Sequence, residues 1–192
     1  MLLEIVLGFV LVVIVASIIA YTAQAYNQII KLEKDVDKAW SNIDVLLQQR
    51  SDELPKLIDT VEQYMDHEKE TILDTVRERY QKTEQAENPN EQAEADSMLQ
   101  GALGDLFAVA EDYPELKANE NFQDLQDRIS SIEEQIADRR EYYNQAATNY
   151  NTLIEQLPYV FLANMMSKTQ KDLYEAPDGS TEDIDINEQF GE

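Results

Sequence analysis

The chain has 192 residues, enough for one soluble domain of ordinary size and a membrane anchor. It contains no cysteine, which excludes disulfides and cysteine-based metal sites. It has one histidine, His67. Thirty-nine acidic and fifteen basic residues give a formal net charge of −24. Such a surface repels phosphate backbones, so we expect no nucleic-acid partner. The acids are spread along every segment, which favours adaptation to high salt over an ordinary acidic protein.

The N-terminal segment predicts a single-pass anchor over residues 1–25. Residues 5–23 carry no charge, and as a helix they would span about 28 Å, close to the thickness of the hydrocarbon core. Only Glu4 precedes this run, whereas Lys31, Lys34 and Lys38 follow it. The lysine bias places the N-terminus outside and the remaining chain in the cytoplasm, with the lipid bilayer as the first expected partner.

A cleaved signal peptide is the alternative, because Ala23-Gln24-Ala25 resembles a cleavage site. The segment before the apolar run has no lysine or arginine, however, and the run is longer than a typical signal core. The anchor is therefore the favoured interpretation.

Beyond the anchor, the sequence predicts an all-α protein. Good helix formers dominate, and apolar residues recur at spacings of three and four. We expect an antiparallel up-and-down four-helix bundle over residues 26–157, and the anchor should continue into its first helix without a break. The expected helices are about 26–50, 52–86, 89–112 and 120–157.

Local signals suggest where these helices begin. Pro55 is costly inside a helix, so Ser51 or Asp52 is expected to cap a second helix that starts just before it. Asn88, with Pro89 after it and Glu91 three residues on, is a capping signal for the third helix. Asn119 or Asn121 should cap the fourth.

The C-terminal region divides into two parts. Residues 158–174 are expected to form an apolar helical cap that closes the bundle, with insertion into the membrane interface as the alternative. Residues 175–192 carry seven acids and no base, and we expect a disordered tail. A short partner-binding motif in that tail is the weaker hypothesis; it would use Ile184, Ile186 and Phe190.

Searches for catalytic and metal-binding motifs give no candidate. A di-iron site in a helical bundle needs two Glu-x-x-His pairs, and the chain has one histidine. The stretch Asp183–Asn187 resembles the start of an EF-hand loop, but Glu188 stands where glycine is required. Phosphate-binding and nucleophile motifs are absent from the sequence. We predict no cofactor, no metal and no catalytic residue.

Polar residues within the apolar stripes are the remaining candidates. Arg50 ends the first stripe, and Arg139 and Arg140 interrupt the last one. A buried guanidinium needs a partner, and Asp44, Glu133 or Glu134 could supply it. Tyr–Asn pairs recur seven residues apart on the last helix, where they can either fix helix register or line a partner groove. The candidate structural or partner-binding residues are Trp40, Asp44, Arg50, Arg139, Tyr143, Asn144, Tyr150 and Asn151.

Two stretches resemble the LemA family: YNQIIKLEKDVDKAWSNIDVLLQQRSDELPKLIDTVEQYMDHE and YPELKANENFQDLQDRISSIEEQIADRREYYNQAATNYNTLIEQLP. The resemblance covers most of the chain between Tyr26 and Pro158 and implies a membrane helix followed by a long-helix bundle. Lys56 and Met65 depart from the family pattern, as does the stretch after Pro158. Matching positions are Tyr26, Asn27, Ala39, Trp40, Ile43, Asp44, Val45, Arg50, Leu54, Pro55, Tyr113, Pro114, Arg139, Tyr143, Asn144, Tyr150, Asn151 and Pro158.

The resemblance implies work in membrane organisation. One branch of the family is similar to proteins needed for magnetosome membranes, and some members neighbour membrane metalloproteases. We therefore expect a non-enzymatic scaffold or adaptor at the cytoplasmic membrane, with a membrane protease or a second copy of the chain as protein partner. The alternatives are a membrane-shaping oligomer and an enzyme whose pocket would contain Asp44, Arg50, Glu133 and Arg139.

Overall fold

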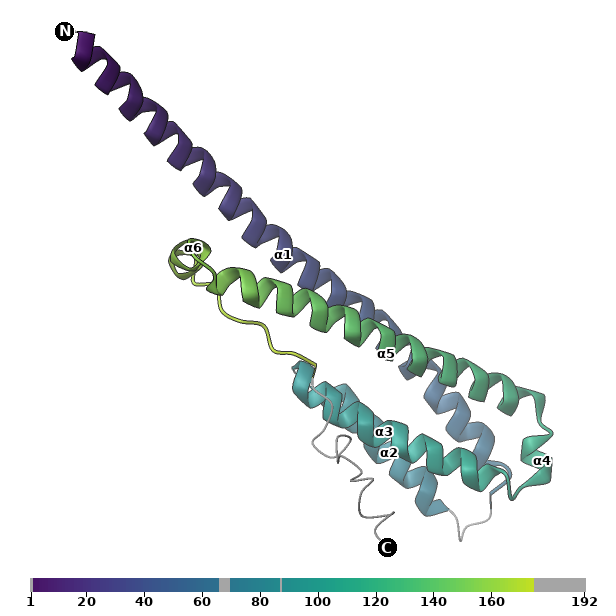
Figure 1. Ribbon diagram of the computed structural model, residues 1–192. Helices are drawn as coiled ribbons and strands as arrows, with labels where there is room; N and C mark the ends of the chain where they lie inside the picture. Colours follow the sequence, from purple (N-terminus) through teal and green to yellow (C-terminus); the bar gives the residue numbers. More distant parts are fainter. Residues whose placement is uncertain (1, 66–69, 87, 175–192) are drawn as a thin grey trace, which may run out of the picture. The chain divides into compact units, whose positions relative to one another are not determined.

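The computed structural model describes residues 2–65, 70–86 and 88–174, which are mostly helical and include no strand (Figure 1). The predicted all-α class is confirmed. His67 and the acidic tail, 175–192, lie outside the described residues. The helices are α1 (Leu2–Glu62), α2 (Glu70–Gln85), α3 (Pro89–Ala110), α4 (Pro114–Lys117), α5 (Glu120–Glu155) and α6 (Tyr159–Met165).

The chain forms two compact units. Of the described residues, unit 1 comprises 2–46 and 136–173, and unit 2 comprises those within 47–135 together with Tyr174. The long helices α1 and α5 each contribute one part to unit 1 and the other part to unit 2.

Helix α1 corrects the predicted boundary near residue 51. It continues through Ser51 and Asp52 to Glu62, with Pro55 inside it. The Ser51 hydroxyl does not cap a helix; it forms a hydrogen bond of 2.7 Å with the Tyr80 hydroxyl. The expected ranges 26–50 and 52–86 are therefore replaced by the end of α1 at Glu62 and the start of α2 at Glu70.

Burial explains why a proline is tolerated in α1. Arg50, Leu54, Leu57 and Val61 are all buried and follow one another at spacings of three and four, so one face of the helix stays in phase through this region. Breaking the helix at Ser51 would move these side chains out of phase. Pro55 itself is exposed, so its ring is not buried against other helices.

The core of unit 2 draws apolar side chains from the end of α1, from α2 to α4 and from the start of α5. Asn88 caps α3 as predicted, because its Oδ1 accepts a hydrogen bond of 2.9 Å from the Glu91 N–H. Asn119 caps α5 in the same way, through the Phe122 N–H at 3.1 Å. The core residues are Leu54, Leu57, Ile58, Val61, Leu73, Val76, Leu99, Ala102, Leu103, Leu106, Ala110, Leu116, Phe122, Leu125 and Ile129.

Unit 1 is built from the first part of α1, the second part of α5, and α6. In this unit α5 runs alongside α1 (Figure 1), and the packed stripes include Ile29, Val36 and Ile43 on α1 and Ile136 and Tyr150 on α5. Before these positions, α1 is long and apolar enough to cross a membrane, and its apolar window is not buried.

Helix α6 contradicts the predicted buried cap. Within it only Ala163 is buried, whereas Phe161 and Met165 are exposed, as is Leu157 just before it. The helix ends at Met165, and Ser167, two residues later, has a φ of 53° in the left-handed region. The Lys168 N–H donates to the Ala163 carbonyl at 2.9 Å, and the Ser167 N–H donates to the Asn164 carbonyl at 3.1 Å. This pair of bonds is a Schellman motif with serine at the position that favours glycine.

Candidate functional site

A buried polar cluster in unit 2 centres on Arg50, which is 2% exposed. Its Nη1 donates to Glu133 Oε1 at 3.0 Å, and its Nη2 donates to Asp96 Oδ1. The Gln92 amide donates to the same Asp96 oxygen at 3.0 Å, and the Tyr174 hydroxyl donates to Asp96 Oδ2. The Arg50 guanidinium therefore joins α1 to α3 and α5, and the Asp96 carboxylate adds Tyr174 to the cluster.

The electrostatics of this cluster favour a permanent positive charge on Arg50. Burial lowers the pKa of the Arg50 guanidinium, but the charges of Asp96 and Glu133 and the hydrogen bonds to them raise it, and the net shift of the pKa is upward. The cation offsets two carboxylates that would be costly to bury alone. Because Arg50 and Asp96 are almost fully buried, a solute has no access to them without unfolding of the cluster.

The sequence predicted one of these partners and missed another. Glu133, one of three acids considered for the arginines, pairs with Arg50, whereas Asp44 is exposed in unit 1. Asp96 was missed. The signal for it was present, because Asp96 precedes the buried Leu99 and Leu103 by three and seven residues and so lies on their helix face.

In unit 1, the predicted residues Trp40 and Tyr143 come together. Their rings contact edge-on with centroids 5.5 Å apart and an interplanar angle of 61°. Tyr143 is buried, and its hydroxyl donates to the Asp172 carbonyl at 2.8 Å. Burial, followed by the negative charges of Asp172 and Asp37, raises the pKa of the Tyr143 phenol.

The segment that Tyr143 holds is the C-terminal strap, defined here as residues 167–173. Asn151 binds its backbone twice: Nδ2 donates to the Lys171 carbonyl, and the Lys171 N–H donates to Oδ1, both at 2.8 Å. Lys168 Nζ pairs with Glu33 at 2.6 Å. Tyr150 is fully buried nearby on α5, and burial is the main cause that raises the pKa of its phenol.

The Tyr–Asn residues of α5 thus act on the chain's own C-terminal segment. Tyr143 and Asn151 supply hydrogen bonds to the strap, and Asn144 is half-buried. Fixing an extended segment to α5 is a structural role, and it was not foreseen from the sequence because nothing in the pattern says which segment the amides meet.

Arg139 corrects a further expectation, because it is exposed rather than buried in the α5 stripe. The buried positions around it are Ile136 and Tyr143, which are seven residues apart and define the packed face without it. Of the four residues proposed for an enzyme pocket, Arg50 and Glu133 pair inside unit 2, and Asp44 and Arg139 are exposed residues of unit 1.

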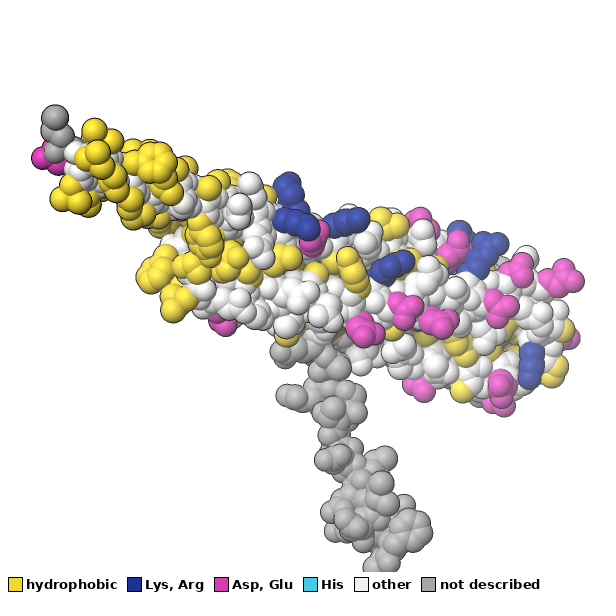
Figure 2. Space-filling view, turned by 45° about the horizontal axis from the view of Figure 1, so that its top comes forward, with side chains coloured by type: hydrophobic (Ala, Val, Ile, Leu, Met, Phe, Trp, Pro, Cys, Tyr) yellow, Lys and Arg dark blue, Asp and Glu magenta, His cyan; other side chains and the backbone are white. Residues whose placement is uncertain are grey.

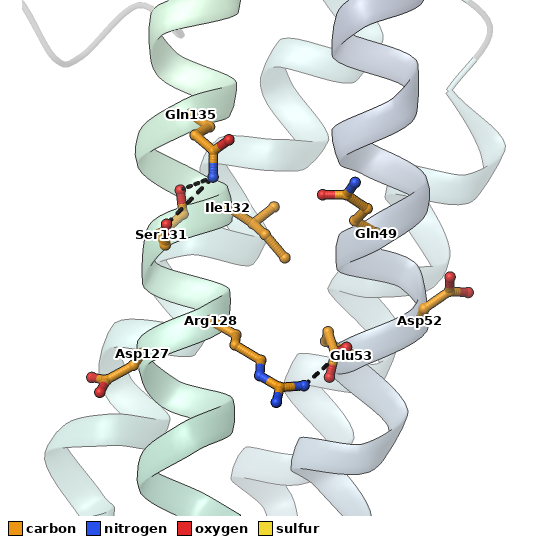
Figure 3. Close-up of a pocket in the computed structure, with 8 residues that line it drawn as sticks. All are labelled: Gln49, Asp52, Glu53, Asp127, Arg128, Ser131, Ile132 and Gln135. Carbon is orange, nitrogen blue, oxygen red and sulfur yellow. Dashed lines mark hydrogen bonds and ion pairs between the residues drawn. The ribbon is translucent and has the colours of Figure 1, made fainter.

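A surface groove of about 490 Å³ lies in unit 2 between α1 and α5 (Figure 3). Arg128 reaches across it toward Glu53, with Nη1 and Oε1 3.8 Å apart. Apart from Ile132 and Glu53, the lining side chains are exposed, so the groove is shallow and does not desolvate a ligand. The lining residues are Gln49, Asp52, Glu53, Asp127, Arg128, Ser131, Ile132 and Gln135.

Metal binding has no support within the described ranges, where no three His, Cys, Asp or Glu side chains are placed to hold an ion. Within unit 2, the buried charges of Arg50 and Asp96 pair with each other, and Glu133 pairs with Arg50. Fold and site together define a helical protein with one candidate membrane-spanning segment and an internally paired polar core.

This chain belongs to the LemA family. The sequence model of that family matches residues 39–187, which include Arg50, Asp96, Glu133 and the strap. The family therefore covers both units, but not the apolar run of α1.

The chain is similar to individual proteins named MamQ and LemA. Magnetosome protein MamQ 2 of Paramagnetospirillum magneticum is 26% identical over 200 residues, which cover 89% of this chain and 74% of the relative. Magnetosome protein MamQ of Magnetospirillum gryphiswaldense is 32% identical over 88 residues, or 45% of this chain and 32% of the relative. Protein LemA of Metamycoplasma hominis is 26% identical over 148 residues, 77% of this chain and 65% of the relative.

Proposed function

We propose that this protein is a non-catalytic scaffold or adaptor that α1 anchors in the cytoplasmic membrane. The observation that carries the proposal is the continuity of α1. One helix includes both the exposed apolar run and Leu54, Leu57 and Val61 of the unit 2 core, with no break from Leu2 to Glu62. Within unit 1, the apolar run and the packed positions Ile29, Val36 and Ile43 thus lie on the same helix.

The distribution of polar residues supports a binding role over a catalytic one. Arg50 is engaged by Asp96 and Glu133, and Tyr143 and Asn151 are engaged by the strap. These residues stabilise the fold. The exposed residues among the predicted set, Asp44 and Arg139, are the candidates for recognition of a protein partner.

We further propose that the four helical segments of unit 2 pack as an up-and-down bundle, with the N-terminus of the chain outside the cell. The sharing of one apolar core by α1, α2, α3 and α5 supports the packing, and the exposed lysines after the apolar run support the orientation. Protease digestion of sealed inside-out and right-side-out vesicles tests the orientation, because only one of them should protect unit 2.

Cross-linking in native membranes, followed by mass spectrometry, tests the scaffold. We expect specific cross-links to a membrane protein, either a membrane protease or a second copy of this chain. Arg139→Leu should reduce them while thermal unfolding stays unchanged. The matched control is Lys117→Leu, which removes an exposed cation from α4 in unit 2 and should leave the cross-links intact.

Two results would contradict this function. Identical cross-links in the wild-type chain and in Arg139→Leu would show that Arg139 does not contribute to partner recognition. The absence of any specific cross-link would contradict the scaffold function. Substrate turnover by the full-length protein in vesicles would point to an enzyme instead.

A further inference from the structure

Large apolar side chains are exposed around α6. Leu157, Phe161 and Met165 are 73%, 67% and 84% exposed. Within α6, the spacing of four residues places Phe161 and Met165 on one side of the helix. Beyond Tyr26, the other large apolar side chains that are exposed in the described part of the chain are scattered singly at Val45, Met98 and Tyr142. A cluster of this kind marks an interaction surface.

The sequence around this cluster is free of charge. Residues 156–167 contain no acidic or basic side chain, in a chain with 39 acids and 15 bases. Glu155 and Lys168 flank the segment. An apolar, uncharged patch with charges only at its edges suits an environment that excludes ions.

The position of α6 relative to α1 identifies that environment. The Tyr159 hydroxyl donates to Gln28 Oε1 at 2.9 Å, so α6 lies beside α1 in unit 1. Gln28 is five residues beyond Ala23, the end of the charge-free run, which corresponds to about 7.5 Å along a helix. The polar headgroup layer on each side of a bilayer is about 5–8 Å thick, so α6 lies at its level when the run spans the hydrocarbon core.

The surface of unit 1 agrees with this placement. Figure 2 shows apolar side chains along the first part of α1 and a second apolar group beside it at the position of α6, and basic side chains begin where the run of α1 ends. Lys31 and Lys34, about one and two turns beyond Gln28, are exposed. In the view of Figure 2, the apolar group at α6 lies beside the apolar first part of α1.

We infer that α6 is an interfacial helix that inserts Leu157, Phe161 and Met165 into the bilayer leaflet from which α1 emerges. This inference rests on the proposed anchoring of α1. We assign lipid as the occupant of the patch for two reasons. Apolar side chains can be buried among acyl chains without any charged partner. In addition, an α1 that spans the bilayer brings α6 to the depth of the headgroup layer. The protein would then contact the membrane through two segments, the transmembrane part of α1 and the interfacial helix α6.

Because the chain has no cysteine, an introduced cysteine can be labelled at a single known position. The full-length chain carrying Phe161→Cys or Met165→Cys is labelled with an environment-sensitive fluorophore and reconstituted in phosphatidylcholine vesicles whose acyl chains are brominated. Val10→Cys, within the apolar run, reports on α1. Thr148→Cys, exposed on α5 in the same unit, is the matched control for a label in water.

We expect bromolipid to quench the labels at 161, 165 and 10 and to leave the label at 148 unchanged. Quenching at 10 without quenching at 161 and 165 overturns the interfacial helix and leaves the anchor in place. If bromolipid does not quench the label at position 10, the proposed anchoring of α1 is wrong, and the interfacial helix that depends on it is wrong as well. Labels at 161 and 165 that are shielded from bromolipid, with a disulfide-linked dimer of the unlabelled Phe161→Cys chain, identify a second copy as the occupant and also overturn the inference.

Discussion

Position 50 of α1 holds an arginine where the buried stripe would accept an aliphatic side chain. Its guanidinium bonds Asp96 on α3 and Glu133 on α5, so one residue of α1 sets the register of two other helices of unit 2. An apolar residue would pack against both helices but would not distinguish one register from the next. Buried charged clusters are known to specify register at some cost in stability, and this cluster fits that role.

Arg50→Met should lower the free energy of unfolding by about 3–5 kcal/mol, because it leaves the carboxylates of Asp96 and Glu133 inside unit 2 without their cation. Chemical denaturation of the full chain in detergent measures the change. Arg139→Leu, at an exposed position, is the control and should stay within about 0.5 kcal/mol of the wild-type chain. Equal losses in the two variants would contradict the buried cluster.

Tyr143 makes a prediction about alkaline pH. Burial and nearby acidic charge raise the pKa of its phenol in the folded state above the value of about 10 that an unfolded chain would show. The stabilisation from the neutral phenol is therefore complete below pH of about 10 and is lost as the pH rises through the folded-state pKa. Tyr143→Phe should make the fall of unfolding free energy with pH shallower in this window.

Denaturation at several alkaline pH values, together with phenolate absorbance, checks this expectation. Tyr142→Phe is the matched control, since it removes the exposed phenol of the neighbouring residue. Parallel curves for Tyr143→Phe and the wild-type chain would show that the Tyr143 phenol does not contribute.

At the scale of the element, α1 keeps a proline in its interior. Pro55 cannot donate a hydrogen bond to the carbonyl four residues before it, and the burial of Leu54 and Leu57 on either side offsets this loss. Local sequence favours a break at this point, whereas the packing of unit 2 favours continuity. Packing prevails because several apolar side chains act together against one unfavourable position.

Pro55→Ala should raise the stability of the protein by up to about 3 kcal/mol, the penalty of proline in a helix interior. Pro89→Ala is the control, because Pro89 lies at the start of α3, where proline costs little, and its removal should give no gain. Thermal unfolding followed by circular dichroism compares the two. No gain from Pro55→Ala would favour the helix start at Ser51 or Asp52.

The end of α6 gives a second prediction at this scale. Ser167 has a left-handed backbone that glycine adopts without steric cost. Ser167→Gly should therefore stabilise the protein by about 1 kcal/mol. Ser97→Gly, in the exposed interior of α3, should destabilise it by about 0.5–1 kcal/mol. The same sign for both substitutions in thermal unfolding would rule out the left-handed cap.

At the scale of the whole molecule, the net charge of −24 is the dominant feature. Repulsion among exposed carboxylates opposes folding, and salt at about 1 M screens charges beyond about 3 Å. Helicity and the temperature of unfolding should therefore rise with added sodium chloride. Sucrose, which favours burial without screening charge, is the control. Full and equally stable helicity in dilute buffer would contradict adaptation to salt.

The class of the fold could be predicted because it depends on local properties of the sequence. Helix formers, the apolar spacing of three and four, and the capping signals at Asn88 and Asn119 act over a few residues each, and all three agree with the structure. The charge-free run of residues 5–23 is likewise a local property, and it predicts the apolar first part of α1.

The remaining features depend on contacts between residues far apart in the chain. Sequence alone determined that this protein is helical, acidic and apolar at its N-terminus, because these follow from composition and short-range spacing. Only the tertiary structure decided that α1 passes through Pro55, that Asp96 is the buried partner of Arg50, that Tyr143 and Asn151 hold the strap, and that Phe161 is exposed. Each of these is a choice among several locally acceptable arrangements, and the free energy of burial and charge pairing across helices makes that choice.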